Sequence, residues 1–464
     1  MKTMKRISSL LLALCLVFCL FSFVSCNNNS EGNTGNSQNA ETQNAIDIKE
    51  YVIVVPTEAS TTLRYAASNL ALLVNQKFGV TLSVVNDSTA PVSKEILIGD
   101  TNREESKTSA SLGQMQYLVL FKNEKIVLKG NGIYVGAACG DFINKYAKIN
   151  AGSTVVDITS VPRGETLLTY SPATTAKSVI FMIGDGMGDN HILMSEANGL
   201  DGFAAKEFPF IGQSITRSQS VINKDAAYTD SAASGTAMST GYKTINGFIG
   251  LDKNGNSVPN VRELAYMAGA KTGVITTDVI TGATPTAYLC HCESRHDEAS
   301  LQSQINELIA QGKVDYCSGS VDNNLTTEVA NALALLSKNS SSFFLMVEEG
   351  YIDKFSHSND HEDVIDCVIR FDDSIEYATQ YALCHPDVAL IVTADHETGK
   401  LLPGPTALGY GFRTSNHTNI NVPIFAIGAG TGVFSGKTIE NIELAKFCAS
   451  VYSNETFGQT EPIE

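Results

Sequence analysis

Residues 178–188 read Ser-Val-Ile-Phe-Met-Ile-Gly-Asp-Gly-Met-Gly, an apolar run that ends in an aspartate between two glycines. A run without polar alternation is typical of a strand that is buried on both faces of a sheet. Similar runs follow at 343–347 and 388–392, and helical stretches alternate with them. This alternation predicts an α/β fold, a mostly parallel sheet with helices on both faces.

Charged side chains follow the ends of these apolar runs. In such a sheet functional residues collect just past the C-terminal strand ends, because the loops converge there and helix N-termini point there. The three ends carry, in chain order, Asp185, then Glu348, then the pair Asp395 and His396. His417 comes shortly before a fourth apolar run. We therefore expect these side chains to share one site.

Asp353 and His357 follow Glu348 closely and are four positions apart. If they lie on one helical turn, both side chains face the same point. Imidazole and carboxylate groups are common ligands of zinc and similar cations. Each residue alone could instead be a turn aspartate, a surface ion pair, a helix cap or a loop histidine. Their joint occurrence at four strand ends favours a metal site.

The run Tyr-Thr-Asp-Ser-Ala-Ala-Ser-Gly-Thr-Ala at 228–237 places Ser231 where a helix could begin. A helix N-terminus presents free N–H groups with partial positive charge, which suits a hydroxyl that must become an alkoxide and meet an anion. Serine is also a common helix cap, and small residues often serve close packing. Ser231 is a candidate nucleophile on this pattern.

The chain of 464 residues is long enough for two or three domains, and its formal net charge is −17. No basic stripe is visible, which argues against nucleic acid as a partner. An anionic substrate would need something other than side-chain charge to attract it. Bound metal cations would serve.

The N-terminal residues have the pattern of an export signal. A basic stretch at 2–6 precedes an apolar run at 10–24 that is short for a membrane span, which predicts a signal peptide over 1–25. Residues 23–26 resemble a bacterial lipobox, in which Cys26 becomes the lipidated first residue. A plain secretory signal is the alternative. Either reading places the protein outside the cytoplasm, anchored by lipid to the bacterial cell membrane or secreted.

Composition divides the rest of the chain. Residues 26–45 are rich in Asn, Ser, Gly and Gln and predict a disordered tether. Strand-like and helical patterns over 46–160 predict a small α/β domain, with its first helix at 61–78. Residues 161–176, rich in Pro, Thr and Gly, predict a linker. The larger α/β domain follows over 177–455.

Seven cysteines remain beyond the predicted lipidation site, and an exported protein could hold disulfides among them. The pattern Cys290-His-Cys292 fits no zinc knuckle, so we interpret this pair as structural. A disulfide to a residue such as Cys317 is one possibility. The sequence does not choose the connectivity.

The motifs at 181–188, 229–237, 282–285, 347–357 and 393–399, together with His417, are similar to the ordered motif series of alkaline phosphatases. The resemblance covers about residues 177–430. It implies an alkaline-phosphatase-like fold and hydrolysis of phosphate monoesters through a phosphoserine intermediate, with release of inorganic phosphate. A homodimer, usual in the family, would be expected as well.

The resemblance also implies a site with two zinc ions and one magnesium ion. The first zinc would take Asp353, His357 and His417, and the second would take Asp185, Asp395 and His396, with Ser231 as the attacking ligand. Magnesium would take Asp185, Thr284 and Glu348. Arg295 matches an arginine that clamps phosphate, and Lys354 matches a lysine that contacts phosphate through water, although it could be a solvated surface residue.

One position departs from the family pattern. Gly282 stands where many relatives carry Asp or His beside the magnesium site, so the third metal could bind more weakly or be exchanged. The module at 46–160, with its loop at 98–103, resembles the accessory α/β domain of α-glucuronidases and β-hexosaminidases. It could act as a spacer or packing module, or contact glycans.

Two other functions remain open. A phosphodiesterase or sulfatase of the same superfamily is one, but no Cys-x-Pro-x-Arg motif is present, and Ser231 with Thr284 and Glu348 favours monoesters. The other is an inactive lipid-anchored surface protein that binds glycan or phosphate. The presence of every expected zinc ligand argues against it.

Overall fold

The computed structural model describes residues 44–149, 152–320 and 324–463. The predicted signal peptide, the predicted lipidation site at Cys26 and nearly all of the predicted tether lie outside these residues. Ala45, the last tether residue, already belongs to strand β1 (Ala45–Asp47). Within the described ranges, no helix combines the length and the apolar character needed to cross a bilayer.

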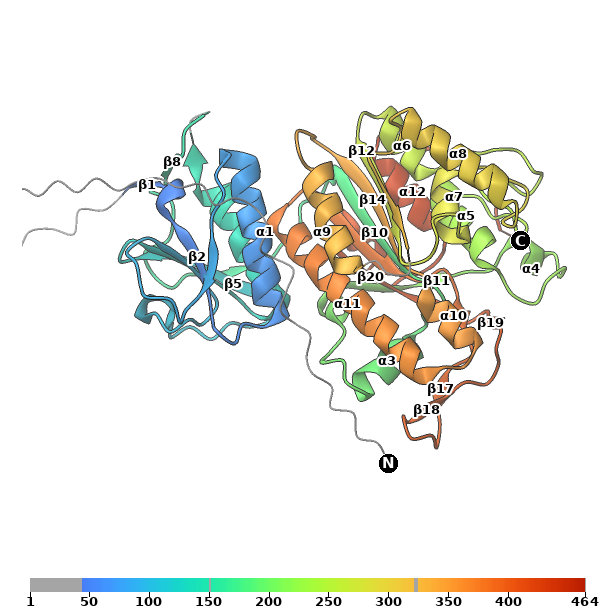
Figure 1. Cartoon of the computed structure of the whole chain (residues 1–464), viewed down its shortest axis with the longest axis horizontal. Helices are drawn as coiled ribbons and strands as arrows, with labels where there is room; N and C mark the ends of the chain where they lie inside the picture. The colour runs from blue at the N-terminus through green and yellow to red at the C-terminus, as the bar shows by residue number, and fades with distance from the viewer. Residues whose placement is uncertain (1–43, 150–151, 321–323, 464) are drawn as a thin grey trace, which may run out of the picture. The chain divides into compact units, whose positions relative to one another are not determined.

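A sheet of eight strands lies at the centre of the larger domain, in the order β13-β12-β14-β10-β15-β20-β11-β21 (Figure 1). The strands from β13 to β15 are parallel to their neighbours, whereas β20 is antiparallel to both β15 and β11. The bounds are Tyr316–Gly319, Lys271–Thr276, Phe343–Glu349, Ser178–Gly184, Val388–Thr393, Val422–Gly428, Phe210–Ile215 and Thr438–Glu440 in the same order. The predicted α/β fold with a mostly parallel sheet is confirmed.

Helices cover both faces of this sheet (Figure 1). Successive side chains of a strand point to opposite faces, and along β10 Phe181 lies in one apolar cluster whereas Ile180 and Met182 lie in the other. The first face carries α5 (Ser231–Thr240), α6 (Val261–Met267), α7 (Ala283–Leu289), α8 (Glu298–Ala310) and α12 (Ile442–Val451). The second carries α3 (Asp189–Ala197), α9 (Leu325–Leu336) and α11 (His361–Cys384).

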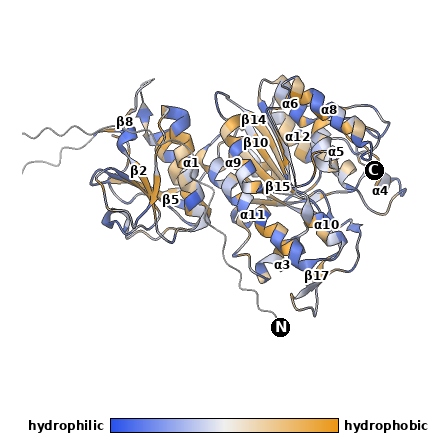
Figure 2. Ribbon diagram, viewed as in Figure 1, coloured by the Kyte–Doolittle hydropathy of each residue, from blue (hydrophilic) through white to orange (hydrophobic). Residues whose placement is uncertain are grey.

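The hydropathy of the ribbon follows the same arrangement (Figure 2). The central strands are mostly hydrophobic, whereas the helices around them carry both hydrophobic and hydrophilic residues. Each large apolar side chain that is fully buried in this way contributes about 1.5–3 kcal/mol to folding. Burial on both faces explains why the apolar runs of the sequence show no alternation.

The N-terminal module has its own six-stranded sheet, in the order β3-β2-β4-β6-β5-β9. Its strands are Val84–Asn86, Val52–Val55, Glu95–Ile98, Lys125–Gly130, Gln116–Lys122 and Leu167–Thr169 in that order, and its main helices are α1 (Thr61–Phe78) and α2 (Val135–Asp141). The small α/β unit is therefore confirmed. Its resemblance to the accessory domain of glycan-active enzymes stays a prediction.

The expectation of a linker over 161–176 is wrong for part of that range. Leu167–Thr169 forms β9, which pairs antiparallel with β5 and completes the edge of the N-terminal sheet. A three-residue edge strand with mostly exposed side chains has no apolar alternation to reveal it, so its Pro- and Thr-rich surroundings dominate the pattern.

The N-terminal module contacts the larger domain through α11. Helices α1 and α2 both lie against α11. The Tyr65 hydroxyl donates to the Asp373 carboxylate, with an O–O distance of 2.8 Å, and the Asn69 amide donates to the Tyr377 carbonyl at 3.4 Å. These bonds join the two modules through buried or half-buried groups.

The cysteines of the described residues are all free thiols. The disulfide considered for the pair Cys290 and Cys292 with Cys317 is absent. Burial raises the pKa of the Cys290 thiol to about 12 and that of Cys317 to about 11, so both remain protonated near neutral pH.

Candidate functional site

Three adjacent strand ends build the floor of the site. In the sheet β10 lies between β14 and β15, and Ile183 of β10 is paired with Glu348 on one side and with Thr393 on the other. Asp185 follows β10 directly, and Asp395 follows β15. The sheet register therefore brings side chains from three distant parts of the sequence to one edge.

The turn after β10 requires glycine at position 186. Gly186 has a φ of +74°, and a Cβ atom there would lie 2.9 Å from Cβ of Asp353 and 2.9 Å from Oγ1 of Thr398. The missing side chain lets the turn close against both residues. The Gly186 N–H also donates to Oδ1 of Asp395 at 3.0 Å, which fixes that carboxylate.

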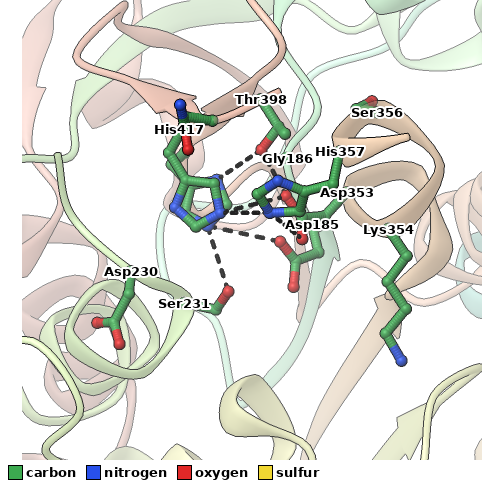
Figure 3. Close-up of polar contacts among 12 residues, drawn as sticks. Asp185, Gly186, Asp230, Ser231, Asp353, Lys354, Ser356, His357, Thr398 and His417 are labelled. Atoms are coloured by element: carbon green, nitrogen blue, oxygen red, sulfur yellow. Dashed lines mark hydrogen bonds and ion pairs between the residues drawn. The ribbon is translucent and has the colours of Figure 1, made fainter. Parts of the chain in front are cut away.

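Asp353 and His357 lie on one turn of helix α10 (Tyr351–His357), which begins just after β14. Nε2 of His357 is 3.3 Å from Asp353 Oδ2. His417 reaches the same carboxylate from β19 (His417–Thr418), with Nε2 3.4 Å from Oδ1. The two Nε2 atoms are 3.0 Å apart (Figure 3).

The tautomers of these two histidines follow from their hydrogen bonds. Nδ1 of His357 is 2.6 Å from the Ser415 carbonyl, and Nδ1 of His417 is 2.8 Å from the Thr229 carbonyl. A carbonyl only accepts, so both Nδ1 atoms carry the proton and both neutral rings present an Nε2 lone pair. Two facing lone pairs at this distance require a proton or a metal cation between them.

His396 presents its Nε2 to a second acidic group. Nε2 is 3.2 Å from Asp395 Oδ2 and 3.6 Å from Asp185 Oδ1. Nδ1 is 3.2 Å from the hydroxyl of Thr398, which itself donates to Asp353, so Nδ1 carries the proton here as well. Asp185 Oδ1 and Asp395 Oδ2 are buried without a hydrogen bond within the described residues.

Ser231 opens helix α5, with its hydroxyl oxygen 3.2 Å from Nε2 of His396. Asp230 is the N-cap, and its Oδ1 accepts from the Ala233 N–H at 2.9 Å. Its other oxygen is 3.4 Å from Nη1 of Arg295. The cap therefore joins the helix N-terminus, the serine and the arginine in one arrangement.

Burial and neighbouring negative charges raise the pKa values of several carboxyl groups in this cluster. Burial, together with the charges of Asp395, Asp353 and Glu348, raises the pKa of Asp185 well above its usual range. Burial also raises the pKa of Asp395 to about 6 and that of Glu348 to about 8. Carboxylates crowded in this way are stabilised in their ionised form by bound cations.

The pKa values of Asp353, His357 and His396 shift in directions that fit this geometry. Burial opposes ionisation of Asp353, but hydrogen bonds from the protonated, positively charged forms of His357 and His417 hold its pKa well below its usual range. The same bond raises the pKa of His357 to about 9. Burial and the nearby charge of His417 lower the pKa of His396 well below its usual range, which keeps its lone pair free.

Two groups of three side chains have the spacing of metal ligands. Asp353, His357 and His417 form one, and Asp185, Asp353 and His396 form the other; within each group the ligand atoms lie within 4.8 Å of one another. Asp353 belongs to both groups. Facing lone pairs, crowded carboxylates and unpaired buried oxygens all fit divalent cations bound in this cluster.

A third cluster surrounds Glu348. Its carboxylate accepts a hydrogen bond from the Thr276 hydroxyl, and both residues are buried. Thr284 lies in the first turn of α7 nearby, and its buried hydroxyl makes no hydrogen bond of good geometry within the described residues. Lys354 does not point toward the histidines (Figure 3). It forms an ion pair with Asp278.

The structure thus brings together most of the residues singled out from the sequence. Ser231 and all six predicted zinc ligands meet at one point, and Arg295 joins them through Asp230. Glu348 lies at the end of the neighbouring strand β14, and Thr284 lies in the first turn of α7. Sequence reasoning missed Thr398 and Asp278. Asp278 stands two positions past the end of β12, which is the same strand-end signal that marks Asp185.

Comparisons with known proteins agree on one family. The family model described as "Alkaline phosphatase" matches residues 176–325 and 317–410. Alkaline phosphatase 4 of Bacillus subtilis is 31% identical over 284 residues, which are 48% of this chain and 62% of that protein. Alkaline phosphatase of Escherichia coli is 27% identical over 355 residues, 52% of this chain and 74% of that protein. The match therefore spans less than two thirds of the Bacillus relative.

Solved structures give the same result for the fold. Alkaline phosphatase from the Antarctic bacterium TAB5 superposes with a TM-score of 0.56 at 26% identity, covering 62% of this chain and 100% of that protein. A variant of that enzyme with bound magnesium superposes with a TM-score of 0.55 at 26% identity.

Proposed function

The chain belongs to the alkaline phosphatase family, and on that premise we propose that it hydrolyses phosphate monoesters and releases inorganic phosphate. One observation carries the proposal. The Ser231 hydroxyl stands at a helix N-terminus, 3.2 Å from Nε2 of His396, beside two groups of ligands that share Asp353. A nucleophile, an anion-binding helix end and cation ligands are the parts that phosphoryl transfer needs.

Two zinc ions and one magnesium ion would occupy the cluster. Asp353, His357 and His417 would hold the first zinc, and Asp185, Asp395 and His396 the second, with Asp353 close to both. Asp185, Thr284 and Glu348 would hold magnesium. When bound, these cations would neutralise the carboxylates, lower the pKa of a bound hydroxyl and polarise the phosphoryl oxygens.

The chain's own residues then supply nucleophile and orientation. The N-terminus of α5 favours the alkoxide form of Ser231, because its free N–H groups carry partial positive charge. Oγ attacks phosphorus in line, the Oγ–P bond forms, and the P–O bond to the leaving group breaks. Water then attacks the phosphorus of the phosphoserine, the Oγ–P bond breaks, and the water oxygen leaves in inorganic phosphate while one water proton returns to Oγ of Ser231.

Arg295 would bind the phosphoryl oxygens. Its guanidinium presents a planar fork of N–H donors that matches two phosphate oxygens at once. The contact with Asp230, 3.4 Å away, orients it beside the N-terminus of α5. A cavity of about 510 Å³ opens next to His417 and is lined also by Tyr228, Lys400 and Arg413. It would take the leaving group.

Relative rates on two substrates test the reaction class. We expect faster turnover of a nitrophenyl phosphate than of its bis-ester by about tenfold or more, which is about 1.4 kcal/mol in the transition state. The comparison is made with one enzyme preparation at equal substrate concentrations. A higher rate on the diester would assign the chain to the diesterases. Glycan binding without metal-dependent phosphate release would support the inactive binding protein instead.

Zinc uptake should release protons from the first ligand group. Without metal, hydrogen bonding to Asp353 raises the pKa of His357 to about 9, so the ring is charged at pH 7.5. Zinc binds only the neutral ring. We expect release of about one proton at pH 7.5 and almost none above pH 10, with zinc affinity rising as pH rises toward 9. Calorimetric titration in two buffers of different ionisation enthalpy measures it.

The raised pKa of His357 also makes the stability of the metal-free protein depend on pH. Because the pKa of His357 is raised on folding, its ion pair with Asp353 stabilises fully below pH 6.5 and is lost as pH rises through about 9. His357→Gln removes both effects, and the exposed His296→Gln serves as the control. Proton release that is unchanged in His357→Gln would contradict this assignment.

We also propose that the protein acts outside the cytoplasm, held to the cell membrane by lipid on Cys26. The support is the N-terminal sequence alone: a basic stretch, an apolar run and a lipobox-like end. Mass spectrometry of the mature N-terminus tests it. A peptide that begins at Cys26 and carries acyl chains is expected, whereas an unmodified N-terminus at another residue would indicate plain secretion.

A further inference from the structure

The space left open by Gly282 is filled by the carboxylate of Asp278. Gly282 precedes α7, and a Cβ atom built on it would lie 3.0 Å from Oδ2 of Asp278 and 3.6 Å from Cγ. A side chain on residue 282 would therefore have to share the place that the Asp278 carboxylate now occupies. A carboxylate is thus present beside the predicted magnesium ligands, although position 282, which carries Asp or His in many relatives, supplies none.

Asp278 is held in this place by its own backbone and by small neighbours. Its N–H donates to the hydroxyl of Thr276 at 2.9 Å, and that hydroxyl donates in turn to Glu348. A Cβ atom on Gly350 would lie 3.1 Å from Cβ of Asp278 and 3.6 Å from Cδ of Glu348. The two acidic side chains therefore stand side by side at the ends of β12 and β14.

Lys354 completes the arrangement. It lies on α10 next to Asp353 and pairs with Oδ1 of Asp278. The pair keeps the lysine beside the site and leaves Oδ2 of Asp278 turned toward the Gly282 position.

An unsatisfied hydroxyl points to a ligand at this place. Thr284 is 1% exposed, and its hydroxyl lies beside the Glu348 carboxylate without forming a hydrogen bond of good geometry within the described residues. A buried hydroxyl without a good hydrogen bond is unfavourable unless a bound ligand satisfies it. Two carboxylates and a hydroxyl form an all-oxygen donor set, which suits magnesium better than zinc.

We propose that Asp278 supplies, from four positions earlier in the chain, the carboxylate that Gly282 lacks in the magnesium site. It acts beside Asp185, Thr284 and Glu348, and it fixes Lys354 next to them. The inference rests on the proposed function, since the site belongs to the same centre. If Asp278 supplies the carboxylate, Gly282 does not weaken the third metal site, and we expect magnesium to bind there with the affinity usual for such a site.

Moving the carboxylate from position 278 to position 282 tests this inference. Magnesium is titrated into the zinc-loaded protein, and its affinity is measured by calorimetry for the parent, Asp278→Ala, Gly282→Asp and the double variant. We expect Asp278→Ala to weaken magnesium binding about tenfold or more, a loss typical of residues that support metal ligands. The double variant should recover most of this loss. Asp278→Asn has nearly the same size and replaces Asp278→Ala if the alanine variant does not fold.

Two further variants separate this inference from general damage. Gly282→Asp alone should lower the melting temperature, because its side chain meets the Asp278 carboxylate, and it should not improve magnesium affinity. Asp201→Ala removes an exposed carboxylate elsewhere and should bind magnesium like the parent. Unchanged affinity in Asp278→Ala and Asp278→Asn would overturn the proposal, as would a folded double variant that binds no better than Asp278→Ala.

These titrations do not depend on turnover. If the parent binds magnesium as described but releases no phosphate from any monoester, the proposed function fails and the assignment of Asp278 stands. If phosphate is released normally while Asp278→Ala binds magnesium unchanged, the assignment fails and the function stands.

Discussion

Replacing Ser231 with alanine should lower kcat for phosphate release by roughly 1,000-fold or more, about 4 kcal/mol in the transition state. The hydroxyl is the atom that would form the bond to phosphorus, and it stands at the N-terminus of α5, 3.2 Å from Nε2 of His396. Alanine removes the nucleophile and keeps the helix, its cap and the ligand groups. The remaining rate would come from direct attack by water.

A second measurement separates loss of the nucleophile from loss of the metals. The parent enzyme should incorporate phosphate covalently when the reaction is quenched in acid, whereas Ser231→Ala should incorporate none and still bind zinc. Ser239 lies on the same helix, and its buried hydroxyl donates to the Ala287 carbonyl at 2.7 Å. Ser239→Ala should lose about 1 kcal/mol of stability with little change in kcat. A Ser231→Ala variant that keeps a tenth of the parent rate would exclude the serine mechanism.

The position of the site could be predicted because it depends on the sheet. Each apolar run predicts a buried strand, and a parallel sheet places all of its C-terminal strand ends at one edge. Asp185 and Asp395 follow two such strands and Glu348 lies at the end of a third, and the three strands are neighbours in the eight-stranded sheet. Their meeting therefore follows from topology, without knowledge of any single side-chain conformation.

The contacts made by long side chains and loops could not be predicted in this way. Lys354 turns to Asp278 because the loop after β12 carries that carboxylate into the space above Gly282, and spacing along the chain gives no sign of the loop's path. Strand β9 is a short edge strand whose pairing depends on β5, more than forty positions away. The tautomers of the three histidines likewise depend on carbonyl and hydroxyl partners from other loops.

Asp353 should be the residue whose loss affects the metals most. Its Oδ2 is 3.3 Å from His357 and its Oδ1 is 3.4 Å from His417, and it also belongs to the group formed with Asp185 and His396. We expect Asp353→Ala to lose the first zinc ion, to bind the second more weakly, and to lower kcat/KM by about 1,000-fold or more, because the carboxylate shared by the two groups is gone. His357→Ala touches only one group and should keep one zinc.

Removal and return of the metals complete this test. A chelator should abolish phosphate release by the parent, and zinc with magnesium should restore it, whereas Asp353→Ala should not recover. Zinc per chain is measured by mass spectrometry of the metal content after dialysis. Asp360→Ala is the matched control, since Asp360 caps α11 close by and its loss should cost about 1 kcal/mol of stability without loss of zinc. If Asp353→Ala retained two tightly bound zinc ions, the two ligand groups would not depend on a shared carboxylate. The assignment of Asp353 as a zinc ligand would then be wrong, and Asp185 and Asp395 would be the carboxylates that hold the zinc ions.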